Sequence, residues 1–156
     1  MRKILCCFSA LAVPVLLCGA LKAQDDSKPD LSGTWQLNPQ KSDMQLNRFS
    51  GLTMVIAEKD GKINITETEK LVDGKERKVI YDCTTDGKDC KVRDEAAKAS
   101  FWYNGPMLVS METKKNGSEV LRERMKLSPD AKELNVEVSS LVPQTDKKDK
   151  LVLDKQ

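Results

Sequence analysis

Five turn dipeptides divide the middle of the chain at short intervals, and they restrict the possible folds more than any other feature. They are separated by 13, 13, 18 and 12 residues and comprise Asp60-Gly61, Asp73-Gly74, Asp86-Gly87, Asn104-Gly105 and Asn116-Gly117. Tight hairpin turns need positive φ at their central residues, which Asn, Asp and above all Gly tolerate. Each pair stands between runs of alternating apolar and polar residues, so the series predicts an antiparallel β meander.

Ten strand candidates follow from the alternation between the turn signals. They span residues 32–38, 52–59, 62–72, 75–83, 88–92, 98–104, 107–114, 119–127, 133–141 and 150–154. Residues 128–131, Ser-Pro-Asp-Ala, add a turn with Pro at its second position. Residues 39–50 show no clear period and are expected to form a long loop or a short helix across an open end, while residues 94–99 carry the one other helical hint. A chain of nearest-neighbour hairpins hides its edges by closing, so we predict an all-β, up-and-down barrel of about 8–10 strands.

Residues 1–23 have the layout of a secretory signal peptide. Two basic residues precede a long uncharged stretch, and small residues follow at Ala20 and Ala23. Cleavage is expected after Ala23, with cleavage after Ala20 as the alternative. The stretch is interrupted by proline and falls short of the ~20 apolar residues of a spanning helix, so no membrane span is expected once the leader is removed. Residues 24–156 are then expected to form a single barrel domain of an exported protein, periplasmic or secreted.

The apparent basicity of the chain comes from its leader. The whole sequence has 26 Lys and Arg against 24 Asp and Glu, but three of the basic residues and none of the acids precede residue 24. The remaining lysines alternate with acids along every segment, without a basic stripe interleaved with stacking aromatics. Nucleic acid is therefore not an expected partner.

Two cysteines remain outside the leader, Cys83 and Cys90, placed symmetrically about the Asp86-Gly87 turn. With that turn as the hairpin centre the two residues face each other, and directly opposed residues have Cα atoms ~4.5–5.5 Å apart, which a disulfide spans. A structural disulfide is expected in an oxidising compartment, with a redox pair as the alternative. Two thiols cannot complete a zinc site in a chain that contains no His.

The absence of His also excludes serine triads and the commonest general base. Carboxylates remain, because Glu67 and Glu69 continue the face that carries Ile63 and Ile65 and could point into the barrel for acid–base chemistry. The favoured interpretation is that this face leaves the core after Ile65 and that both glutamates are solvated. No catalytic residue, metal or cofactor is expected.

An aromatic cluster, Phe101-Trp102-Tyr103, offers candidate ligand-binding residues. On a strand, Phe101 and Tyr103 share one face and Trp102 takes the other. If Phe101 and Tyr103 point inward together with Met107 and Met111, they line a pocket with adaptable walls, and Trp102 marks an outer contact surface. In the alternative interpretation, all three rings belong to the core.

The segment 31–38 reads Leu-Ser-Gly-Thr-Trp-Gln-Leu-Asn. A Gly-x-Trp on the first strand of an up-and-down barrel resembles the lipocalins and their wider calycin relatives. The chain is more closely similar to short exported bacterial lipocalin-like proteins of unassigned function. They share this opening segment and a following Lys-Ser pair like Lys41-Ser42, and they are also similar over residues 81–88, 126–130 and 151–156.

The resemblance implies that Trp35 plugs the closed end of a barrel and forms the floor of a ligand site. In true lipocalins an Arg late in the barrel packs over this Trp, whereas residues 150–154 contain none, so Arg122 and Arg124 are the candidate substitutes. The implied function is non-enzymatic binding of a small apolar or amphipathic ligand. The alternative is an envelope or secreted module with a filled barrel that binds or inhibits another protein.

Overall fold

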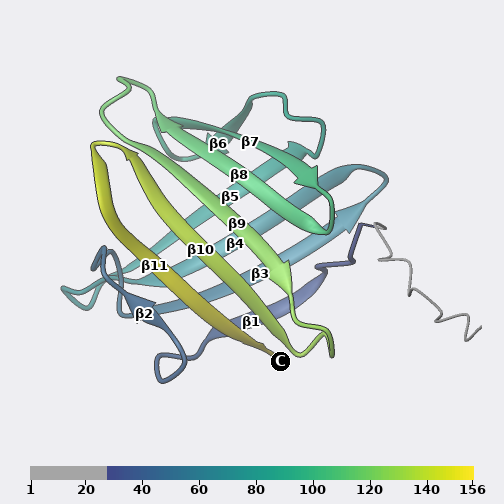
Figure 1. Ribbon diagram of the computed structural model, residues 1–156. Helices are drawn as coiled ribbons and strands as arrows, with labels where there is room; N and C mark the ends of the chain where they lie inside the picture. The colour runs from purple at the N-terminus through teal and green to yellow at the C-terminus, as the bar shows by residue number, and fades with distance from the viewer. Residues whose placement is uncertain (1–27) are drawn as a thin grey trace, which may run out of the picture.

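The computed structural model describes residues 28–156, which form a closed antiparallel barrel (Figure 1). The signal peptide expected at residues 1–23 lies outside the described residues. The strands follow one another around the barrel in chain order, and β1 pairs with β11 to close it. The strands are β1 (Gly33–Leu37), β2 (Asp43–Met44), β3 (Gly51–Lys59), β4 (Lys62–Lys70), β5 (Glu76–Thr84), β6 (Cys90–Arg93), β7 (Ala97–Asn104), β8 (Met107–Lys114), β9 (Val120–Leu127), β10 (Glu133–Val142) and β11 (Gln144–Lys155).

The predicted fold class is confirmed, since ten strands of the described chain close into one lipocalin-like barrel. The short β2 lies outside this ring, paired along β11. Strands β8 to β11 cross in front of β3 to β5 at a large angle, as the tilt of a closed barrel requires (Figure 1). None of the described residues forms a helix with the length and apolar character needed to cross a membrane.

All five turn dipeptides connect adjacent strands, as predicted. The clearest example is Asp60-Gly61, where both residues have positive φ, 52° and 74°, and Lys59 pairs directly with Lys62. These are the backbone angles of a two-residue hairpin turn whose twist matches that of its strands. The turn therefore sets the register of β3 against β4.

One local prediction is wrong, and for another the structure selects between two alternatives. Residues 94–99 do not form a helix: Asp94 has a φ of 60° and belongs to the tight turn from β6 to β7, which begins at Ala97. Strand pairing on both sides overrides the weak helical propensity of the alanines. Residues 39–50 form a loop that includes β2, and Phe49 from this loop is buried in the core.

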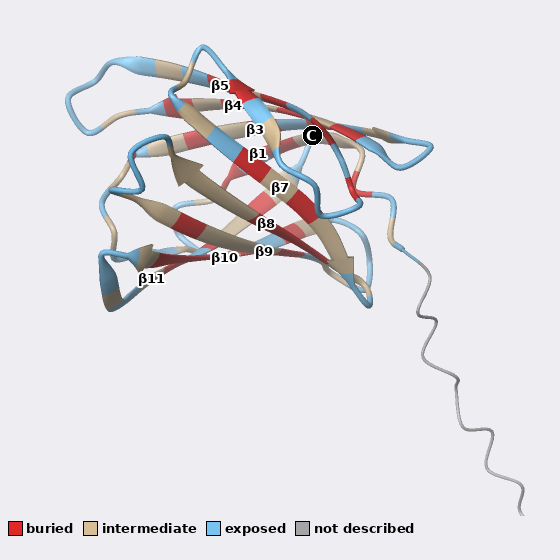
Figure 2. Ribbon diagram, turned by 90° about the horizontal axis from the view of Figure 1, so that it is seen from above, coloured by how far each residue is buried: buried red, intermediate tan, exposed pale blue. Residues whose placement is uncertain are grey.

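Buried positions alternate with more exposed ones along many of the strands (Figure 2). Most of the buried row lies on the inner face of the barrel. In one half of the interior these positions are large and apolar. They include Trp35, Met54, Ile63, Ile65, Phe101, Leu108, Met125, Leu134 and Leu153, each at most 2% exposed. This half is a packed core rather than a chamber.

Candidate functional site

The other half of the barrel interior holds a cavity of about 240 Å³ lined mainly by charged side chains. It forms because the inward row of several strands changes from apolar to polar residues partway along. On β4 the row runs from Ile63 and Ile65 to Glu67 and Glu69, and all four are buried. On β8 the inward row passes from Leu108 to Ser110 in the same way.

Charged groups from several strands and three connecting segments converge on this cavity. Within the described chain its lining includes six glutamates, two arginines and one lysine, namely Glu67, Glu69, Glu95, Glu112, Glu119, Glu123, Arg48, Arg77 and Lys114. Val79, Ala99 and Leu121 supply apolar wall. With every group in its usual ionised form the cavity would carry an excess of negative charge.

The expectation that Glu67 and Glu69 are solvated is wrong. Glu67 is 6% exposed and Glu69 is 2% exposed, so the β4 face stays inside the barrel over its whole length. Arg77, across the strand pair on β5, donates from Nε to Glu69 Oε2 at 2.7 Å, and its Nη2 forms an ion pair with the same oxygen at 2.6 Å. The buried carboxylate of Glu69 is therefore compensated by a guanidinium, as buried charges require.

A second group of contacts joins other side chains that line the cavity. Lys114 Nζ is 3.4 Å from a carboxylate oxygen of Glu112 and 3.5 Å from one of Glu95, and Arg77 lies 3.7 Å from Glu95. Tyr81 donates its hydroxyl to Glu112 Oε2 at 2.6 Å. Burial raises the pKa of Tyr81 well above its ordinary value, and the nearby glutamates add to the effect, so the phenol remains a donor.

The loop before β3 covers one side of the cavity through Arg48. Its guanidinium is 3.9 Å from Glu123 and 3.6 Å from the buried Asp149 of β11, and it stacks on the ring of Phe49 with 5.0 Å to the ring centroid. Asp149 also accepts a hydrogen bond from the Leu46 backbone at 2.8 Å. Arg48 Nε has no hydrogen-bond partner among the described residues. One buried carboxylate thus anchors the loop that carries the arginine.

Burial dominates the electrostatics of Glu67 and Glu123. It raises the pKa of Glu67 well above the ordinary glutamate value, and the charges of Glu123 and Glu69 raise it further, while Arg48 acts in the opposite direction. Burial also raises the pKa of Glu123, partly offset by Arg48. The pair favours holding at least one proton.

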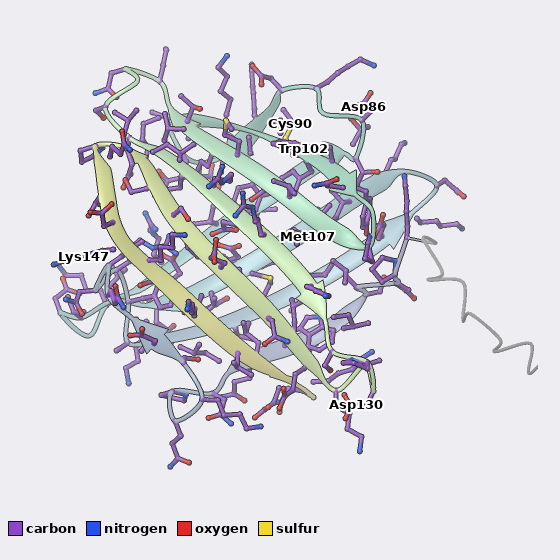
Figure 3. The ribbon with its side chains drawn as sticks, in the orientation of Figure 1. Asp86, Cys90, Trp102, Met107, Asp130 and Lys147 are labelled. Atoms are coloured by element: carbon purple, nitrogen blue, oxygen red, sulfur yellow. A yellow bond between two sulfur atoms is a disulfide. The ribbon has the colours of Figure 1, made fainter. Side chains whose placement is uncertain are left out.

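The structure separates the residues that the sequence placed in a ligand pocket. Around the β7–β8 turn Asn104 pairs with Met107, so Phe101 lies opposite Ser110 and Trp102 lies opposite Val109. Alternation then puts Met107 and Met111 on the outer face with Trp102, while Phe101 points inward. Figure 3 shows Trp102 and Met107 on these neighbouring strands.

The remaining inward candidates also lie away from the cavity. Phe101 is buried and its ring meets that of Tyr81 edge to face, with 5.6 Å between centroids. Trp35 is fully buried and donates from Nε1 to the Leu31 carbonyl at 2.9 Å. Tyr103 donates its hydroxyl to Glu58 at 2.6 Å. None of the five candidate ligand-binding residues lines the charged cavity.

The cation over Trp35 is neither of the two predicted arginines. Lys155, at the end of β11, places Nζ 5.1 Å from the ring centroid of Trp35. Arg124 instead forms an ion pair with Glu137 at 3.1 Å, and alternation puts Arg122 on the same outer face of β9. The prediction was wrong because a lysine just beyond residues 150–154 takes the place of the arginine. Gly33 leaves room for this lysine, since a Cβ there would lie 3.1 Å from Lys155 Cε.

The predicted disulfide is present. Cys83 and Cys90 are joined with 5.5 Å between their Cα atoms, and the pairing of Tyr81 with Val92 continues the register expected from the Asp86-Gly87 turn. Figure 3 shows Cys90 near this turn. No group of three or more acidic or cysteine side chains in the described part of the chain has the geometry to hold a metal ion.

Comparison with known proteins finds a similar fold but no similar sequence. No family model matches the chain, and no curated protein matches it. A solved structure of a secretary abundant heat soluble (SAHS) protein from Ramazzottius varieornatus superimposes with a TM-score of 0.58 at 12% sequence identity. The alignment covers 80% of this chain and 94% of the SAHS chain. At this identity the likeness concerns the fold alone and supports a lipocalin-like barrel.

Proposed function

We propose that this chain is an exported, non-enzymatic binding protein whose ligand is a small amphipathic cation, such as an amine with a short hydrocarbon part. The observation that carries the proposal is the cavity, in which six glutamates face three cationic side chains within the described chain. A ligand with a positive charge would be attracted to this excess of carboxylates. A barrel interior is also a common place for small-molecule sites.

The size and walls of the cavity support a small ligand with one apolar part. At about 240 Å³ it is smaller than the ~300–1,000 Å³ of usual ligand pockets, so it suits only a few non-hydrogen atoms. Val79, Ala99 and Leu121 could contact a hydrocarbon chain while the carboxylates contact an ammonium group. Of the ligand classes expected from the sequence, the amphipathic one fits this lining better than a purely apolar one.

Export remains part of the proposal. It is supported by the leader expected from the sequence and by the disulfide, which is typical of oxidising compartments. Localisation of the tagged protein in its native host, with cell fractionation and N-terminal sequencing of the mature form, tests this part. An intact N-terminus in the cytosolic fraction would contradict it.

A second candidate function, binding or inhibition of another protein, rests on the outer face of β7 and β8. Trp102 lies directly opposite Val109 there, with Met107 and Met111 on the same face. An aromatic ring with methionines is typical of interaction surfaces. Loss of a captured partner from a Trp102→Ala variant that keeps its cavity ligand would favour this candidate.

Three small ligands of nearly identical shape but different charge test the ligand proposal. Isothermal titration calorimetry at mildly alkaline pH would compare n-butylammonium, 1-butanol and n-butyrate. We expect only the cation to bind, with a Kd on the order of 1 mM, because so few atoms limit the binding energy. Glu67→Gln should weaken the cation about tenfold, whereas Glu76→Gln, an exposed control on β5, should not. Equal binding of butyrate would contradict the proposal.

A further inference from the structure

Two of the six cavity glutamates, Glu67 and Glu119, have carboxyl groups without a partner among residues 28–156, and of these only Glu67 is buried. Glu69 is paired with Arg77, Glu112 with Tyr81 and Lys114, and Glu123 with Ser110 at 3.4 Å and with Arg48 at 3.9 Å. No hydrogen bond or ion pair to the Glu67 side chain occurs within residues 28–156. With 6% exposure, this unpartnered acid lies against the cavity. Its charge, if present, is left without a counterion.

The surroundings of Glu67 oppose a negative charge from nearly every side. Its strand neighbours across the sheet are apolar, Met54 on β3 and Val79 on β5. Charged and titratable groups from several strands and loops face the cavity with it. They are Glu69 on β4, Arg77 and Tyr81 on β5, Glu112 and Lys114 on β8, Glu123 on β9, Glu95 and Glu119 in the segments before β7 and β9, and Arg48 on the covering loop. Each of the three cations already contacts another carboxylate. Burial raises the pKa of Glu67 for the same reasons.

We propose that Glu67 holds a proton while the cavity is empty and releases it to solvent when a cationic group enters, so that the cavity exchanges one proton for one ligand cation. The inference rests on the proposed function and adds its regulation. The neutral acid and free alkylammonium become a carboxylate–alkylammonium pair plus a released proton, so charge and atoms balance. The cavity keeps the same net charge in both states, which avoids an uncompensated buried charge at either stage.

Proton exchange makes cation binding depend on pH with a defined sign. Below the pKa of Glu67 in the empty protein, the ligand must displace a proton, so the affinity rises about tenfold per pH unit. Above that pKa the carboxylate is already formed and the affinity levels off. Low pH would therefore release the ligand.

Two measurements on the full mature chain test the inference. Infrared difference spectra of the empty protein at neutral pH should show a protonated carboxylic acid band in the wild type that is missing from Glu67→Gln and present in Glu76→Gln. Calorimetry with n-butylammonium in buffers of different ionisation enthalpy should show about one proton released per ligand by the wild type and by Glu76→Gln, and none by Glu67→Gln.

The outcomes separate this inference from the proposed function. If n-butylammonium binds without proton release, or if Glu123→Gln rather than Glu67→Gln abolishes the release, the exchange at Glu67 is overturned while cation binding stands. If the protonated carboxyl band is present but no amine binds, the proposed function is overturned and the exchange with it. If no such band is present, Glu67 is ionised in the empty cavity and the inference fails.

Discussion

The two halves of the barrel interior share one backbone pattern but differ in chemistry. Around Trp35 and Phe101 the inward positions are large and apolar, and they fill the space between the strands. Around Glu67 the same alternation continues with charged side chains, and the space is hollow. The packed half stabilises the fold through buried apolar side chains. The cavity half contains buried acids, which lower the stability of the fold and are typical of functional sites.

Replacing one leucine in each half by alanine tests this difference most strongly. Leu108→Ala, in the packed half, should lower the free energy of unfolding by about 3–5 kcal/mol, because it creates a new void among close-packed side chains. Leu121→Ala, beside the existing cavity, should cost only about 2 kcal/mol, because one side of this leucine already faces the cavity. Urea unfolding followed by tryptophan fluorescence measures both. Equal losses would mean that the two halves are packed alike.

The disulfide should contribute to the fold without affecting the cavity. Replacing both Cys83 and Cys90 by Ser should destabilise the protein by about 2 kcal/mol, since the bridge closes a short loop. We expect n-butylammonium to bind the folded double variant as it binds the wild type. A large loss of affinity in protein that is still folded would show that the hairpin also positions the cavity walls.

Removing the charge of Glu67 should change how stability depends on pH. The raised pKa of Glu67 means that the folded wild type binds this proton more tightly than the unfolded chain does. Stability should therefore fall as pH rises from the ordinary glutamate pKa through the raised one. Glu67→Gln should remove this fall in stability. At pH values above the raised pKa the variant should be more stable than the wild type, by roughly 1 kcal/mol for every pH unit that separates the folded and unfolded pKa values. Urea unfolding at a series of pH values measures it, and parallel curves for the two proteins would contradict it.

The smallest effect is expected at the packed end. Lys155→Met keeps much of the side-chain length over Trp35 but removes its charge, so it should cost only ~0.5–1 kcal/mol. Thermal unfolding of this variant, with Lys132→Met as an exposed control, measures the difference. A loss of several kcal/mol would mean that the cation is a major support of the closed end.

Local features of the sequence were sufficient to predict the meander, the turns and the disulfide. Each depends on residues close in the chain, such as Asp60-Gly61, whose backbone angles the residue types favour. The register across the Asp86-Gly87 turn likewise placed Cys83 opposite Cys90.

The cavity could not be predicted in the same way, because it depends on two non-local choices. Both faces of β8 contain apolar residues. The more apolar row, Met107, Val109 and Met111, favoured a prediction that this row faces inward, but the structure places it on the outer face and the row with Ser110 inside. The charge environment of Glu67 depends in part on Arg48, which belongs to a loop without a clear sequence period. The sequence did contain one signal for the cavity, since Glu67 and Glu69 continue the face that carries Ile63 and Ile65. Because glutamates are usually solvated, this signal was interpreted as a face that leaves the core.

The central claim, that one half of the barrel is core and the other a cation site, is tested most directly by mapping a bound cation with NMR. Titration of isotope-labelled protein with n-butylammonium should shift backbone and side-chain signals around Glu67, Tyr81 and Leu121. The signals of Leu134 and Leu153 in the packed half should stay unchanged. Shifts confined to the outer face around Met107, or centred on Phe101, would contradict the claim.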